Sequence, residues 1–173
     1  LKSNGVVGTV MANLGLRKFL EENNIDFIAA NVGDRYVLEE MIKGEYNLGG
    51  EQSGHFLLLD DNTTGCGLLS AVKLLEVIKE TGESMADLNN LMVSYPQVLV
   101  NAKVSNETKN KYLEDEEIKS AIEKFEKDFH GKGRVLIRPS GTEPLVRVMV
   151  EGEDELILEE KCRQLVELIE NRL

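Results

Sequence analysis

The sequence predicts an α/β protein: a partial doubly wound βαβ sheet domain followed by a small α+β C-terminal domain. Three observations support this fold class. Strand-like and helix-like segments alternate through the first half of the chain, as they do in mainly parallel sheets. The order changes to β-α-β-β-α near residue 96. The length of 173 residues suits one ordinary domain or two small ones. We therefore expect one domain over residues 1–96 and a second over residues 97–173.

The elements of the first half follow from hydrophobic spacing and from turn residues. Runs of β-branched or apolar residues predict strands, and apolar residues three or four apart predict helices. Asp34 and Ser84 are expected as helix N-caps, and Gly44 and Gly82 as helix ends. The expected strands are 6–10, 25–30, 47–50 and 55–59, and the expected helices cover 16–20, 35–43, 68–81 and 85–92.

The second half contains fewer and longer elements. Residues 98–104, 134–138 and 145–150 alternate like strands, with turn residues between the last two. Two amphipathic helices are predicted by apolar residues at helical spacing, which are Ile118, Ala121, Ile122, Phe125 and Phe129 in one helix and Leu158, Cys162, Leu165 and Ile169 in the other.

Composition excludes several classes of protein. The formal net charge of −11 argues against a general nucleic-acid or anionic-membrane surface. The sequence contains no apolar run of the length that a transmembrane helix needs. With only Cys66 and Cys162 present, no disulfide framework is indicated. The expected location is therefore the cytoplasm, with no nucleic acid and no membrane as partner.

The segment RPSGTEP, residues 138–144, is a candidate anion-binding loop between two predicted strands. Arg138 offers a planar fork that matches phosphate oxygens, and Arg147 on the next strand could add a second. Ser140 and Thr142 supply hydroxyls, and backbone amides around Gly141 can form an anion-binding nest. A plain β-turn with arginines in surface ion pairs is the alternative.

The segment GGEQSGH, residues 49–55, is a second candidate site. Glu51 would lie at the carboxyl end of a parallel strand, where open α/β sheets bind ligands. Glu51 and Ser53 could hold sugar hydroxyls, and His55 could move protons near neutral pH. The alternative is a hairpin with a partly buried histidine. In the nearby segment NVGDR, Arg35 could be a ligand or a surface charge.

These segments together resemble the C-terminal part of the α-D-phosphohexomutase superfamily. The resemblance runs from Leu1 to Leu173 and is carried, in order, by GGEQSGH, TTGCGLLSAVKLLE and RVLIRPSGTEPLVRVMVEG. Finer detail is similar to the branch that acts on glucosamine phosphates, through GTVMANLGL, NVGDRYVLEEM and GGEQSGHF. The alternatives are a member that acts on glucose or mannose phosphates, and a phosphosugar-binding module that never catalyses.

The resemblance implies most of the third domain and all of the fourth domain of a four-domain isomerase. Such an enzyme interconverts glucosamine 6-phosphate and glucosamine 1-phosphate through a bisphosphorylated sugar, a phosphoserine and a magnesium ion. The superfamily roles carry over as phosphate binding to Arg138, Ser140, Gly141, Thr142 and Arg147, sugar binding to Glu51 and Ser53, and a place near the reacting centre to His55.

Two superfamily motifs are absent from the sequence. Neither a serine loop of the type T-A-S-H-N-P nor a magnesium loop of the type D-G-D-x-D-R occurs. We therefore expect the phosphoserine and the magnesium ligands to lie in the N-terminal domains of the same enzyme, which are the expected partners. This chain alone is expected to hold no metal and to show no mutase activity.

The sequence also departs from the superfamily pattern at two places. Residues 29–31 read Ala-Ala-Asn where a basic triplet is expected, which would weaken phosphate attraction at that strand end. Cys66 replaces an aspartate that would cap the following helix, and cysteine is a poorer cap.

Overall fold

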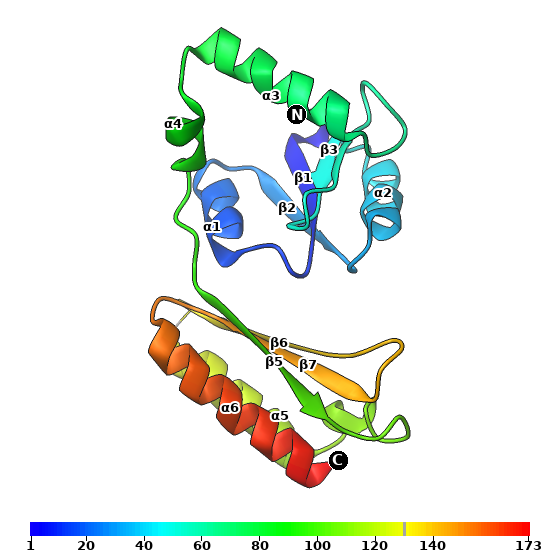
Figure 1. The fold of residues 1–173 in the computed structure, drawn as a ribbon, viewed down its shortest axis with the longest axis vertical. Helices are drawn as coiled ribbons and strands as arrows, with labels where there is room; N and C mark the ends of the chain where they lie inside the picture. Colours follow the sequence, from blue (N-terminus) through cyan, green and yellow to red (C-terminus); the bar gives the residue numbers. More distant parts are fainter. Residues whose placement is uncertain (130) are drawn as a thin grey trace. The chain divides into compact units, whose positions relative to one another are not determined.

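The computed structural model describes residues 1–129 and 131–173 (Figure 1). Its contacts divide the chain into two compact units, Leu1–Ser94 and Tyr95–Leu173. The first unit contains a mixed, mainly parallel sheet and the second a small antiparallel sheet, so the predicted fold class is confirmed. The expected domain boundary at residue 96 stays a prediction.

The sheet of the first unit has four strands in the order β2-β1-β3-β4. Strand β1 pairs in parallel with both β2 and β3, whereas β4 returns antiparallel to β3. The carboxyl ends of the three parallel strands therefore lie at one edge of the sheet, and the loops after them share that edge. The strands are β1 (Gly5–Thr9), β2 (Asp26–Ala30), β3 (Leu48–Gly50) and β4 (Phe56–Leu58).

A small hydrophobic core lies between this sheet and helix α2 (Asp34–Lys43). Val37 and Met41 of α2 are fully buried beside Val7 of β1. The close packing needs a glycine in β3, because a Cβ at Gly49 would lie 2.5 Å from the Met41 sulfur. The other elements are a short 3₁₀ turn (Lys2–Asn4), α1 (Leu14–Glu22), α3 (Gly67–Thr81) and α4 (Met85–Asn89).

Helix ends test the predicted caps. Ser84 is the N-cap of α4 in a capping box with Asp87, and Gly82 ends α3 in the left-handed conformation, as predicted. The predicted N-cap at Asp34 is wrong by one residue, because Gly33 takes that position with a φ of 129°. Asp34 is instead the first helical residue, where its carboxylate accepts from the Arg35 amide.

Helix α3 is present as predicted, but most of its large apolar residues are exposed in the described chain. None of its side chains is buried, and Leu68 and Leu75 are 77% and 63% exposed. Its N-cap residue, Cys66, makes no side-chain capping hydrogen bond, in agreement with the poor cap expected of cysteine.

The second unit has the predicted β-α-β-β-α order. Its strands pair antiparallel in the order β5-β7-β6, and both long helices lie on one face of this sheet (Figure 1). A 3₁₀ turn, Lys111–Leu113, precedes the first long helix. The elements are β5 (Gln97–Lys103), α5 (Glu116–Asp128), β6 (Arg134–Pro139), β7 (Leu145–Glu151) and α6 (Glu155–Arg172).

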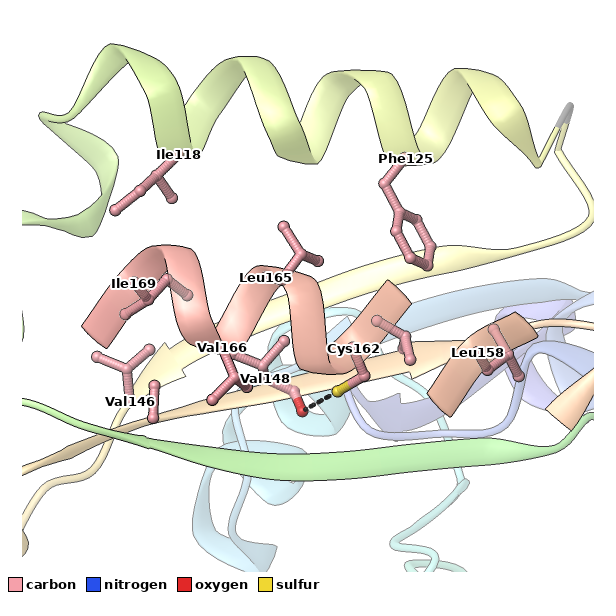
Figure 2. Packing of buried hydrophobic residues seen from close by; sticks show 11 residues of the cluster. Ile118, Phe125, Val146, Val148, Leu158, Cys162, Leu165, Val166 and Ile169 are labelled. Atoms are coloured by element: carbon pink, nitrogen blue, oxygen red, sulfur yellow. Dashed lines mark hydrogen bonds between the residues drawn. The ribbon is translucent and has the colours of Figure 1, made fainter. Parts of the chain in front are cut away.

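The core of the second unit lies between the helices and strand β7. Figure 2 shows Ile118 and Phe125 of α5 above α6, with Val146 and Val148 of β7 below. The Cys162 thiol of α6 donates to the Val148 carbonyl oxygen at 3.6 Å, and burial raises the pKa of this thiol to about 11. Cys162 is therefore a packed, protonated residue of the core.

Side chains alternate between the two faces of the sheet along β7, and this alternation determines which face Arg147 occupies. Because Val146, Val148 and Val150 are fully buried in the core against the helices, the side chains between them occupy the opposite face. Arg147 is one of these.

In the part of the chain that the structure describes, no helix is long and apolar enough to cross a membrane. The predicted cytoplasmic location stays a prediction.

Candidate functional site

Two arginines lie directly opposite each other at the end of the hairpin formed by β6 and β7. The antiparallel register pairs Arg138 of β6 with Arg147 of β7. Paired residues in antiparallel strands extend to the same face, and like charges opposite each other destabilise a sheet. The pair lies on the face away from the helices and therefore favours an anion as its counterpart.

The local charge of this pair is only partly balanced. Among residues 1–129 and 131–173, the Arg138 guanidinium has no hydrogen-bonding or ion-pairing partner. Burial lowers the pKa of Arg138, and the charge of Arg147 lowers it further. Arg147 donates through Nη2 to the Glu143 carboxylate at 3.1 Å, but its buried Nε has no partner in the described part of the chain. Two guanidinium groups thus retain unused donors at one spot.

The loop between the strands is held by its own hydrogen bonds. The Ser140 amide donates to the Leu145 carbonyl at 2.9 Å, and the Glu143 amide donates to the Ser140 hydroxyl at 3.2 Å. Ser140 is only 4% exposed, so its hydroxyl is an internal part of the turn in this state. A role for Ser140 as a ligand stays a prediction.

The tip of this loop leaves two backbone donors available. Gly141 and Thr142 are exposed, and their amides have no acceptor within the described parts of the chain. Successive free amides beside a positive side chain are the typical elements of an anion nest. The predicted phosphate loop therefore has two amides and two arginines at one place, although its hydroxyl at Ser140 is turned inward.

A lysine outside the motif completes the support of the loop. Lys109 lies 31 residues before Ser140, and its ammonium group donates to the Ser140 carbonyl at 2.7 Å. It also donates to the Glu143 carbonyl at 3.3 Å. Sequence reasoning missed Lys109, because a lysine in a polar loop shows no pattern that distinguishes it from a surface charge.

The second candidate site lies at the carboxyl edge of the parallel sheet. Glu51 follows β3, and its Oε1 accepts from the Gly33 amide of the loop after β2 at 2.9 Å. Its Oε2 lies 3.6 Å from Nδ1 of His55, and the Ser53 hydroxyl lies 3.3 Å from the same nitrogen. The structure thus brings together Glu51, Ser53 and His55.

The side chains of Glu51 and His55 differ in how far they are exposed to solvent. The Glu51 side chain is 11% exposed, whereas that of His55 is 65% exposed. A fixed carboxylate with an accessible histidine beside it can accept from a ligand hydroxyl and transfer a proton. Arg35 is paired on the exposed face of α2, where its Nε donates to Glu39 at 2.8 Å. The structure therefore favours a surface charge over a ligand at this position.

The two clusters belong to different units, and neither includes a metal site. In the two described stretches of the chain, no group of three or more His, Cys, Asp or Glu side chains could hold a metal ion. The residues present do not fit a resident magnesium ion, so no metal-dependent step can be derived from them.

Two family models match the chain and together cover most of it. Residues 1–95 match the phosphoglucomutase/phosphomannomutase α/β/α domain III. Residues 99–168 match the C-terminal domain of the same family. The two matches occur in the order in which the two structural units follow each other along the chain.

Curated relatives match over the whole length of the chain. The phosphoglucosamine mutase of Caldanaerobacter subterraneus subsp. tengcongensis is 60% identical over 173 residues, which are 100% of this chain and 39% of the relative. That of Finegoldia magna is 58% identical over 172 residues, which are 99% of this chain and 38% of the relative. The chain therefore spans less than two fifths of the length of these relatives.

Solved structures show the same fold at low identity. An Aspergillus fumigatus N-acetylphosphoglucosamine mutase in complex with GlcNAc-6P and magnesium aligns with a TM-score of 0.80 at 16% identity, over 96% of this chain and 38% of that one. An N-acetylglucosamine-phosphate mutase in its substrate complex aligns with a TM-score of 0.77 at 22% identity, over 95% of this chain and 38% of that one. Together with the family models and the close relatives, these likenesses show that the chain belongs to the phosphoglucomutase/phosphomannomutase family, of which it contains domain III and the C-terminal domain.

Proposed function

We propose that this chain is the substrate-recognition part of a phosphoglucosamine mutase. The complete enzyme would interconvert glucosamine 6-phosphate and glucosamine 1-phosphate through a bisphosphorylated sugar and a phosphoserine outside this chain. The observation that carries the proposal is the Arg138 guanidinium opposite Arg147, which together with the nearby amides of Gly141 and Thr142 has no partner among the described residues. The 60% identity to a phosphoglucosamine mutase favours the amino sugar over glucose or mannose.

The loop at residues 138–144 would hold the phosphate that is not being transferred. Each guanidinium fork can donate to two oxygens of the same phosphate, so the two forks would share oxygens. The loop amides can donate to the remaining one. Phosphate would also remove the repulsion between Arg138 and Arg147, which gives the anion an advantage over water at this site. Binding and orientation are thus the tasks of this loop.

The edge at residues 51–55 would hold the sugar ring. Glu51 is already fixed by the Gly33 amide, so its second oxygen is oriented before the ligand arrives. Ser53 could add a hydroxyl contact, and His55 could take or give a proton near the reacting centre. Magnesium and the phosphoserine are proposed only for the complete enzyme, with their residues outside this chain.

The proposed function predicts ligand binding without turnover. Titration of the 173-residue chain with inorganic phosphate and with glucosamine 6-phosphate should shift the amide resonances of Gly141 and Thr142. The Ser140 amide should respond less, because it already donates to Leu145. The same chain should give no product in a coupled mutase assay. If neither ligand moves the Gly141 and Thr142 resonances, the loop is only a turn and the proposal fails.

In the complete enzyme, Glu51→Gln should lower kcat/KM for glucosamine 6-phosphate by roughly ten- to hundredfold, the usual range for a lost charged hydrogen bond. Glutamine is preferred to alanine because its carbonyl oxygen can still accept from the Gly33 amide and keep the loops together. The matched control is Glu39→Gln on the exposed face of α2, which should leave kcat/KM unchanged. Near-normal efficiency of Glu51→Gln, with an unchanged circular dichroism spectrum, would remove Glu51 from the site.

A further inference from the structure

We propose that Lys109 is a positioning residue for the phosphate loop and aims the Gly141 amide at the bound anion. This inference rests on the proposed function, because that function assigns a phosphate to the loop of residues 138–144. It adds a residue that lies outside both recognised motifs and comes from the segment between β5 and α5.

The geometry follows from a single peptide unit. The Ser140 carbonyl and the Gly141 amide belong to the same peptide, and in a trans peptide the two groups point in opposite directions. The Lys109 ammonium holds the Ser140 carbonyl at 2.7 Å. The Gly141 N–H is therefore directed away from Lys109, toward the outer side of the loop.

A second contact makes the loop resist rotation. The Lys109 ammonium also holds the Glu143 carbonyl at 3.3 Å, so it joins both ends of the loop tip. Without this bridge, the exposed glycine at 141 could change its φ and ψ readily, because it has no Cβ and even a Cβ built there would meet nothing within 4 Å. An amide that is oriented before phosphate arrives costs less entropy on binding.

The segment that carries Lys109 is itself fixed. The Lys109 amide donates to the Ser105 carbonyl at 3.0 Å, in a turn that the Ser105 and Thr108 side chains close. Three residues further on, the Tyr112 hydroxyl donates to the Ile137 carbonyl at 3.0 Å, directly before Arg138. Lys109 thus extends from a segment tied to the same strand that presents the phosphate-binding arginine.

The experiment compares lysines of the same segment in the 173-residue chain, with inorganic phosphate as the probe. Lys109→Met should raise the Kd for phosphate by roughly three- to twentyfold, the effect of losing charge-assisted bonds that orient a donor. It should also shift the Gly141 amide resonance in the phosphate-free protein. Lys111→Met removes the same charge from an exposed site and should do neither. Lys109→Arg, which keeps donors and charge, should bind within about threefold of the parent chain.

The outcomes separate this inference from the proposed function. If the parent chain binds no phosphate, both fall. If the parent binds but Lys109→Met stays within twofold of it, or Lys111→Met loses as much affinity, the positioning role is wrong and the phosphate loop stands. Should Lys109→Met lose its dispersed amide spectrum, Lys109→Gln takes its place in the same comparison, with the same outcomes deciding.

Discussion

Arg138→Ala is expected to weaken the binding of inorganic phosphate by roughly ten- to hundredfold, which corresponds to the loss of charge-assisted hydrogen bonds. Among the side chains of this loop, Arg138 has the most N–H donors without an acceptor, since its guanidinium has no partner among the described residues. It lies partly buried opposite Arg147. Its removal leaves the amides of Gly141 and Thr142 with one guanidinium, and that one is shared with Glu143. Isothermal titration of the 173-residue chain measures the change.

Arg138→Lys should restore only part of the lost affinity. A guanidinium meets two phosphate oxygens at once, whereas an ammonium offers a single point charge on a flexible stem. Although burial and Arg147 lower the pKa of Arg138, arginine stays protonated at any pH near neutrality. Any pH dependence near pH 6 in the binding of glucosamine 6-phosphate should therefore follow the second ionisation of its phosphate monoester, with tighter binding above it, and should persist in the lysine variant.

The matched control is Arg163→Ala on α6. Arg163 pairs with Glu159 on an exposed helix face, so its replacement should leave phosphate affinity unchanged. Under the proposed function, Arg138→Ala in the complete enzyme should slow both half-reactions, because either phosphate of the proposed bisphosphorylated sugar would have to occupy this loop in turn. Binding by Arg138→Ala equal to that of the parent would show that the arginine has no role in holding the anion.

Much of the fold was predictable because local spacing and turn chemistry agree with it. Apolar spacing located α5 and α6, and runs of β-branched or apolar residues located most of the strands. The motifs also indicate Arg138 and Glu51 as candidate ligands, and these roles stay predictions. What spacing could not predict is the register of the hairpin, since a shift by one residue would remove Arg138 from its place opposite Arg147.

The misses concern contacts between residues distant in the chain and details of local backbone geometry. The bond from the Gly33 amide to Glu51 and the bonds from Lys109 to the phosphate loop join residues far apart in sequence. The inward turn of the Ser140 hydroxyl depends on the Glu143 amide, which no residue pattern reveals. The shift of the N-cap from Asp34 to Gly33 follows from backbone geometry at the end of the preceding loop. Such contacts require three-dimensional placement.

Glu151→Ala is expected to lower the free energy of unfolding of the second unit by about 3–5 kcal/mol, the range for removing one partner of a buried ion pair. The Glu151 side chain is fully buried, and its Oε2 accepts from Nε of Arg134 at 2.6 Å. Its Oε1 accepts from the Gln97 side chain at 2.9 Å. Because the register aligns Gln97, Glu151 and Arg134 across β5, β7 and β6, one carboxylate links all three strands of the sheet.

Hydrogen exchange of the Val148 and Val150 amides reports on this unit alone, since both lie in the central strand of its sheet. The control is Glu159→Ala, which removes the exposed partner of Arg163 and should cost at most about 0.5 kcal/mol. The loss in Glu151→Ala arises mainly from the broken bond between the Glu151 carboxylate and the Arg134 guanidinium, so the double variant Glu151→Leu with Arg134→Met should recover most of the stability. If the double variant is no more stable than Glu151→Ala, the loss comes from packing and not from the broken ion pair. If Glu151→Ala costs no more than the exposed control, the carboxylate does not hold the three strands together.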